Sequence, residues 1–250
     1  MKWLISSTVL LLLLFLSANA QEDGAGWLKR IDDAERVQHM VGEVDQIITT
    51  SSGAKRTLSL KSWSAENGDI SLMAYTAPPR VKGDKILMRE GGDVIWYYMK
   101  RRDVTRQFAG HTRKQKVMGS DFSYEDMSQG NMTEDYSAEL IGFEDIESIS
   151  CVKLHLTPTE SGPSYDHLLI WACRENALSR KIEYYDSDGL MKTLVLSDIR
   201  EIEGRKIAFK FVMLNNREGS ETAMQYQTVT FASEPEGWIF TKEALDRDVK

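Results

Sequence analysis

Alternation of apolar and polar residues dominates most of the chain and predicts a largely β structure. The runs KRTLSLKSWS and DISLMAYTA alternate on either side of ENGD, in which Asn67-Gly68 is a strong hairpin signal. The runs DKILMRE and DVIWYYMK flank Gly91-Gly92 and predict a second hairpin. From Ser137 onward, seven more alternating runs are separated by turn residues. We therefore expect roughly ten or eleven strands, joined consecutively in one antiparallel meander.

Two segments depart from this alternation and predict helices. Over residues 26–37, Trp27, Ile31 and Ala34 (or Glu35) recur at helical spacing, with charged residues on the other face. Residues 101–135 are polar and charged without clean alternation, which indicates a loop with short helices. Because strand twist accumulates, a sheet this long must curl. Since runs such as VIWYYM are apolar on both faces, we expect the helices over 26–37 and around 121–135 to cover the inner side and leave an apolar interior.

The first twenty residues have the pattern of a secretory signal peptide. Lys2 precedes an apolar run, and Ala18-Asn19-Ala20 provides small residues before a cleavage site. The run is too short and wrongly flanked for a membrane span. Position 21 is Gln rather than Cys, so no lipid-attachment cysteine follows. We expect residues 1–20 to be removed and residues 21–250 to form one exported, soluble, unanchored domain.

The charge of the chain narrows the range of partners. The formal net charge is −7, and the sequence shows no basic block. Both features argue against binding to nucleic acid and against electrostatic binding to anionic membranes.

The two cysteines, Cys151 and Cys173, lie in neighbouring strand-like runs, SCVKLHL and HLLIWAC. In a hairpin centred on Gly162 they would lie directly opposite each other, at a separation compatible with a bridge. Export to an oxidising compartment favours a disulfide over a redox or metal pair. We expect a Cys151–Cys173 disulfide; the alternative is two buried free thiols.

The segment MGSDFSYEDM, residues 118–127, places Asp121, Glu125 and Asp126 among apolar residues. Such a set could serve acid–base chemistry, which needs a nearby nucleophile or a second base. The same letters also contain an S-x-x-D capping pattern at Ser123 and Asp126, with Phe122 and Met127 pointing inward. We favour the structural interpretation, in which the acids cap a short helix and pair with nearby basic residues.

Other catalytic and metal signatures are missing from the sequence. The four histidines have neither HxxH nor HExxH spacing, and no G-x-S-x-G is present. We therefore predict no catalytic residue, no metal site and no cofactor.

Aromatic and methionine residues at alternating strand positions suggest a cavity. Methionine adapts to irregular apolar shapes, and a large curled sheet with few covering helices is hard to fill completely. The residues that we expect to line this cavity are Trp63, Met73, Tyr75, Met88, Trp96, Tyr98 and Trp171.

Several of these segments together resemble the LolA-like outer-membrane lipoprotein-sorting family. The resemblance rests on PPRVKGDKILM, WYYM, MGSDFSYEDM, YYDSDGLMKTL, IEGRKIAFKFVM and IFTKEALDRD, which span nearly all of the expected mature chain in order. MGSDFSYEDM is specific to one branch, although Lys100 stands where that branch usually carries Pro. The resemblance implies an α+β fold, mostly antiparallel β: one strongly curved, unclosed half-barrel with helices over its concave face.

The resemblance also implies a role without catalysis. It indicates a periplasmic carrier that shelters acyl chains of lipoproteins or lipids, with an inner-membrane transporter as donor and an outer-membrane acceptor. The alternative is a non-enzymatic periplasmic sensor or scaffold that docks a membrane partner. For the lid and its structural motif we expect Trp27, Ile31, Gly119, Asp121, Phe122, Tyr124 and Asp126.

Overall fold

The structure is a computed structural model that describes residues 23–108, 110–128, 131–160, 162–232 and 234–249. The predicted signal peptide, residues 1–20, lies outside the described residues. Across the described residues, no helix is both long and apolar enough to span a membrane.

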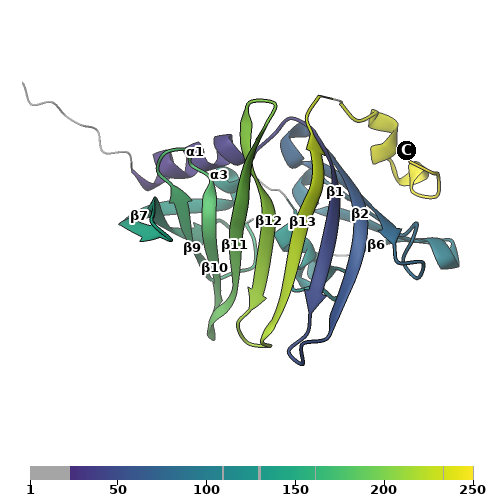
Figure 1. Cartoon of the computed structure of the whole chain (residues 1–250), viewed down its shortest axis with the longest axis horizontal. Coiled ribbons are helices and arrows are strands. Elements are labelled where there is room, and N and C mark those ends of the chain that lie inside the picture. The colour runs from purple at the N-terminus through teal and green to yellow at the C-terminus, as the bar shows by residue number, and fades with distance from the viewer. Residues whose placement is uncertain (1–22, 109, 129–130, 161, 233, 250) are drawn as a thin grey trace, which may run out of the picture.

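The described residues form one curved, unclosed antiparallel sheet of 13 strands, with helices on its concave side (Figure 1). The predicted fold class is confirmed. The strand order is β6-β5-β4-β3-β2-β1-β13-β12-β11-β10-β9-β8-β7. The strands are β1 (Met40–Thr49), β2 (Lys55–Ala65), β3 (Ile70–Ala77), β4 (Lys85–Arg89), β5 (Val94–Met99), β6 (Val104–Phe108), β7 (Tyr136–Ile146), β8 (Ile149–Pro158), β9 (His167–Cys173), β10 (Ser179–Asp186), β11 (Gly189–Ile202), β12 (Arg205–Asn215) and β13 (Ser220–Thr230).

The topology explains why the segment between β6 and β7 covers the concave face of the sheet. The first and last strands, β1 and β13, pair in the middle of the sheet, so β6 and β7 become its two opposite edges. The connection from β6 to β7 must therefore cross the open side. It carries α2 (Tyr124–Met127) and α3 (Met132–Asp135), and α3 contacts α1 (Gly24–Glu35).

Two strands, β1 and β6, were not predicted from the sequence. Along β1 the inward positions are Gly42, Val44, Gln46 and Ile48, all buried. Two of these four are not apolar, so the alternation is obscured. Edge strand β6 has no buried residue, and an exposed edge strand gives little hydrophobic pattern.

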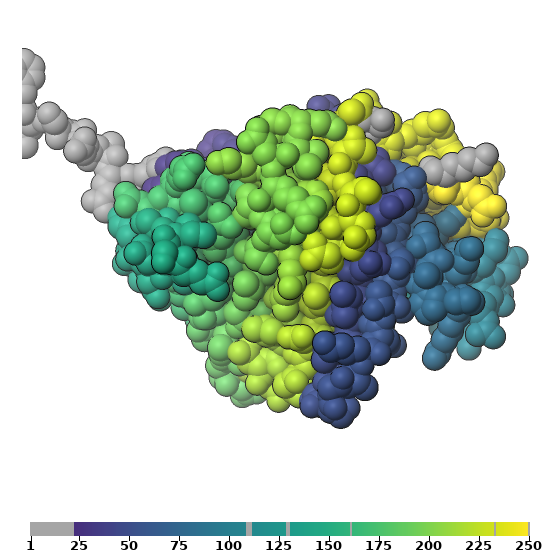
Figure 2. All heavy atoms as spheres, viewed as in Figure 1, coloured from purple at the N-terminus to yellow at the C-terminus, as the bar shows by residue number. Residues whose placement is uncertain are grey.

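The core lies on both faces of the sheet. On the concave face, one cluster joins α1 to β7–β13, and a second joins β1–β5 to Tyr124. A third cluster lies on the outer face, where Ile239, Phe240 and Leu245 of the C-terminal segment cover β2–β5. Figure 2 shows the outer face, with the C-terminal segment in yellow beside the blue strands. Strand β5, which is apolar on both faces, is therefore covered twice, by Tyr124 of α2 inside and by the C-terminal segment outside.

The cysteine register is confirmed, but the predicted disulfide is not formed. Cys151 and Cys173 lie directly opposite each other across β8 and β9, and both are buried free thiols. Burial raises the pKa of the Cys151 thiol, which disfavours the reactive thiolate.

Candidate ligand-binding cavity

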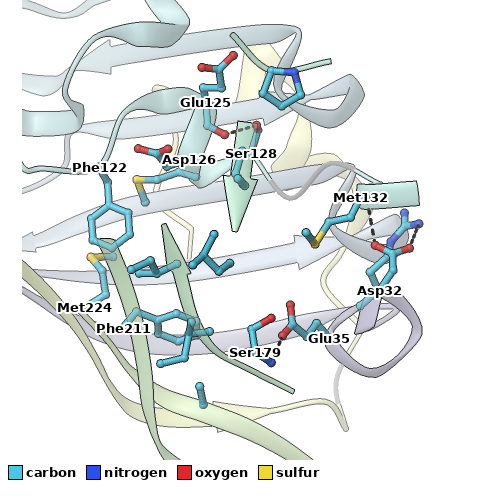
Figure 3. A pocket seen from close by; sticks show the side chains of 18 of the residues that line it. Asp32, Glu35, Phe122, Glu125, Asp126, Ser128, Met132, Ser179, Phe211 and Met224 are labelled. Atoms are coloured by element: carbon cyan, nitrogen blue, oxygen red, sulfur yellow. Dashed lines mark hydrogen bonds and ion pairs between the residues drawn. The ribbon is translucent and has the colours of Figure 1, made fainter. Parts of the chain in front are cut away.

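A cavity of about 360 Å³ lies between the helices and the concave face of β9–β13. This volume falls in the range of small-molecule pockets. Its apolar wall includes Phe122 from the segment before α2 and side chains from four strands (Figure 3). The strand residues used below are Leu168, Leu194, Leu196, Phe211 and Met224.

The alternation of the strands aims these side chains at the cavity. Leu194 and Leu196 lie two residues apart on β11 and therefore share one face. Their partners across the β11–β12 pair are Met213 and Phe211, which consequently lie on the same face. Val195 and Val212 pair between them and face the other side of the sheet. An apolar inner wall thus follows from the period-two pattern of LMKTLVLSDIRE and RKIAFKFVMLN.

Helix α1 closes one side of the cavity. Its N-terminus is capped by Asp23, whose side chain accepts a hydrogen bond from Gly26 N at 2.8 Å. Trp27 and Ile31, predicted as lid residues, are buried against the β7–β8 side of the sheet. Gly24 allows this close approach, since a Cβ there would lie 2.3 Å from the carbonyl oxygen of Ala138 on β7.

Three acidic residues attach the MGSDFSYEDM segment to the sheet, across its concave face. Asp121 accepts hydrogen bonds from Ser220 Oγ at 2.6 Å and from Thr222 Oγ1 at 2.8 Å, both at the start of β13. Glu125 accepts one from Ser164 Oγ at 2.8 Å, in the loop before β9. Each of these acids therefore links the segment to a separate part of the sheet.

The third acid, Asp126, both caps α2 and joins it to the sheet. Ser123 and Asp126 form the S-x-x-D capping box that the sequence pattern indicated. Asp126 also accepts a hydrogen bond from Tyr165 OH at 2.5 Å and forms a buried ion pair with Lys192 on β11. This arrangement agrees with the structural interpretation of the three acids.

The remaining motif residues serve the fold in different ways. Gly119 has a φ of +71°, a conformation that favours glycine, and Arg56 lies close enough to meet any added Cβ. Tyr124 is buried in the second inner cluster, where its ring meets Phe108 at a centroid distance of 5.1 Å. Phe122 and Asp126 are the predicted motif residues that line the cavity, and Phe122 presents its ring to the apolar wall, as Figure 3 shows.

None of the seven residues that the sequence suggested for a cavity lines this one. Three of them lie in the inner cluster beneath Tyr124: Met73, Tyr75 and Met88. Another three lie on the outer face under the C-terminal segment: Trp63, Trp96 and Tyr98. Six of the seven are buried and Trp96 is partly buried, but alternation alone does not say which face encloses a void.

The seventh residue, Trp171, lies on the outer face of β9. Its Nε1 donates a hydrogen bond to Glu144 at 3.0 Å, and the Lys181 ammonium lies 3.6 Å from its ring centroid. Lys153 lies over the same ring at 4.6 Å. Trp171 is thus covered by charged side chains and is separated from the cavity by the sheet.

One end of the cavity is acidic, which the sequence analysis missed. Asp32 and Glu35 from α1 lie at this end (Figure 3), and Asp135 from α3 also lines the cavity. Burial raises the pKa of all three carboxyls above the ordinary range. The spacing offered a signal: Leu28, Ile31, Asp32 and Glu35 follow the i, i+3, i+4, i+7 pattern of a buried helix stripe.

The arrangement suits binding of an amphiphile. A mostly apolar wall can hold a hydrocarbon chain, and the acidic end can hold a polar head group. Within the described residues, His, Cys, Asp and Glu side chains form no group of three or more that could hold a metal ion.

Comparison with protein families assigns the chain to one of them. A family model described as "Uncharacterized protein" matches residues 67–247, which is more than half of the chain. The chain belongs to this family. No curated protein matches the sequence.

Three solved structures share the fold of this family member. A putative outer membrane lipoprotein-sorting protein domain from Vibrio parahaemolyticus has a TM-score of 0.83 at 21% identity, covering 90% of this chain and 98% of that chain. A DUF1329 family protein from Desulfovibrio piger has a TM-score of 0.82 at 25% identity, covering 89% and 97%. A LolA superfamily protein from Nitrosomonas europaea has a TM-score of 0.74 at 22% identity, covering 88% and 98%. The expected resemblance to LolA-like proteins is confirmed for the fold.

Proposed function

We propose that this protein is a periplasmic, non-enzymatic carrier that shelters acyl chains of lipoproteins or lipids during sorting to the outer membrane. The observation that carries the proposal is the apolar cavity under α1, α2 and α3. The shared fold with a lipoprotein-sorting domain and a LolA superfamily protein supports it. The proposal includes removal of residues 1–20 and a single domain over residues 21–250.

Physical chemistry explains why such a carrier needs a covered cavity. Each CH₂ group moved out of water contributes about 0.8 kcal/mol, so a free acyl chain in water is costly. A covered cavity removes the chain from water, and a cover that moves allows loading and release. The cavity is at the low end of the pocket range. The cover consists of α1 and residues 121–135. We propose that it moves outward when cargo enters.

Cargo transfer requires partners on both sides of the periplasm. We propose an inner-membrane transporter as donor and an outer-membrane protein as acceptor. Affinity must stay moderate, because a carrier that binds too tightly cannot release its cargo.

The experiment is native mass spectrometry of the gently purified protein. We expect acyl species to co-purify with the wild type. Phe211→Asp places a charge in the apolar wall and should abolish loading, whereas Val212→Asp, the next residue on the opposite face of β12, should not. Ala208→Phe tests the same point without a new charge, because it fills the cavity.

Circular dichroism and thermal unfolding verify that each variant is folded. Loading that is equal in wild type, Phe211→Asp and Ala208→Phe would contradict the proposal. An empty protein that co-purifies with a membrane protein would favour the sensor or scaffold alternative instead.

A further inference from the structure

The acidic end of the cavity indicates which kind of head group the cargo has. Asp32 and Glu35 lie one turn apart on α1, and Asp135 is the last residue of α3. Figure 3 shows Asp32, Glu35 and Ser179 together at one end, away from Phe122 and Met224. Glu125 and Asp126 line the opposite side, where hydrogen bonds from Ser164 and Tyr165 hold them, so the apolar wall lies between that side and the end at Glu35.

Two of the three carboxylates lack a cationic partner. Asp32 accepts a hydrogen bond from Met132 N at 3.2 Å, and Arg36 lies 3.5 Å from its other oxygen. Among the described residues, no basic side chain is within ion-pair distance of Glu35 or Asp135. Arg113 influences Asp135 only from farther away, and it forms its ion pair with Asp93.

Ser179 adds a second, independent sign of a missing ligand. Its amide N–H donates to Glu35 Oε1 at 2.6 Å. Its side chain is fully buried and lines the cavity, and its hydroxyl faces Glu35 without a hydrogen bond of regular geometry. A buried polar group without a partner costs about 1–3 kcal/mol. A ligand group that hydrogen-bonds to both Glu35 and Ser179 would remove this cost.

We infer that the cavity takes an amphiphile whose head group carries a protonated amine, with the ammonium at Glu35 and Ser179 and the hydrocarbon tail against Leu194, Leu196 and Phe211. This deepens the proposed function, on which it rests. An ammonium supplies three donors and one positive charge, and Glu35 has a hydrogen bond from Ser179 N but no cationic partner among the described residues. A carboxylate or phosphate head group would meet like charges instead.

The test compares three probes with one tail and different heads: hexadecylamine, hexadecanol and hexadecanoate. Binding is measured by displacement of a fluorescent acyl probe, below the critical micelle concentrations. We expect the amine to bind about tenfold tighter than the alcohol, since hydrogen bonds to charged groups contribute about 1.5–3 kcal/mol. The carboxylate should bind most weakly.

Glu35→Gln keeps an oxygen that can accept from Ser179 N while it removes the charge. It should bring amine affinity down to that of the alcohol and leave alcohol affinity unchanged. Glu43→Gln, at an exposed position on β1, removes the same charge elsewhere and should retain the amine preference.

The outcomes separate this inference from the proposed function. If all three probes bind equally, or if Glu43→Gln lowers the amine preference as much as Glu35→Gln does, the inference about the head group is wrong while the carrier function stands. If no probe displaces the acyl probe, or if the acyl probe itself does not bind, the carrier function fails as well.

Discussion

Lys192 on β11 and Asp126 on α2 form an ion pair that is almost completely withdrawn from solvent, with side-chain exposures of 7% and 1%. The same carboxylate accepts the Tyr165 hydroxyl and the backbone N–H of Ser123. One acidic residue therefore caps the cover helix and joins it to the sheet. These partners compensate the buried charge of Asp126. Losing any one of them should therefore destabilise the packing of α2 against the sheet.

Lys192→Met should lower the free energy of unfolding by about 3–5 kcal/mol, because it leaves the Asp126 charge buried without its partner. Urea denaturation measures the change. Lys29→Met is the control: Lys29 and Asp33 form an exposed i, i+4 pair on α1, which contributes at most about 0.5 kcal/mol. Similar losses in both variants would mean that the buried pair has no special role.

Glu35→Gln should stabilise the protein at neutral pH. Because burial raises the pKa of Glu35 in the folded state, ionising it costs more in the folded than in the unfolded chain. Stability should therefore fall as pH rises from the ordinary carboxyl pKa to the raised one. Glu35→Gln should remove that part of the decline, so its advantage should vanish at acidic pH.

The control for this pH effect is Asp186→Asn. Arg217 lowers the pKa of Asp186 to about 2, so its stabilising contribution is present at neutral pH and is lost as pH falls toward that value. Asp186→Asn should therefore be less stable than wild type at neutral pH, the opposite sign to Glu35→Gln. Unfolding free energies at several pH values measure both, and an unchanged pH profile in Glu35→Gln would contradict the assignment.

A reversible cross-link can test whether the cover moves. Asp121 and Thr222 are in direct contact, through a hydrogen bond from Asp121 N to Thr222 Oγ1 at 2.9 Å. The double variant Asp121→Cys/Thr222→Cys should lose probe uptake when oxidised and regain it when reduced. The single variants, treated in the same way, should show no redox dependence. Equal uptake in both redox states of the double variant would show that this segment does not move.

The C-terminal segment should matter for stability but not for binding. Leu245 is buried on the outer face in the cluster that contains Trp63, on the opposite side of the sheet from the cavity. Leu245→Ala should cost about 2–5 kcal/mol of stability. At a temperature where the variant remains folded, its probe affinity should equal that of wild type. A selective loss of affinity would connect this cluster to the cavity.

Much of the fold could be predicted because local patterns determine it. The turns at Asn67-Gly68 and Gly91-Gly92 do join neighbouring strands, and the position of Gly162 gave the correct Cys151–Cys173 register. Alternation specifies strands well where one face is buried and the other wet. It failed at β1, where Gly42 and Gln46 occupy inward positions, and at the exposed edge strand β6.

The cavity could not be located from the same patterns. Trp96 is apolar and strand-borne, but the C-terminal segment, distant in sequence, covers its face of the sheet. The polar end was missed because the pattern placed Trp27, Ile31 and Ala34 or Glu35 on the inner face of the helix and gave no polar role to that face. The contact of α1 with α3 and the hydrogen bond from Ser179 on β10 to Glu35 show that Asp32 and Glu35 face inward.

The most direct test of the central claim is photolabelling with a long-chain alcohol that carries a diazirine in the middle of its tail, followed by peptide mapping. The account predicts labels on the cavity wall, at Leu168, Leu194, Leu196, Phe211 and Met224. Excess unlabelled hexadecanol should suppress them. Labelling confined to the outer face around Trp63 and Trp96, or labelling no stronger than in the heat-denatured protein, would contradict it.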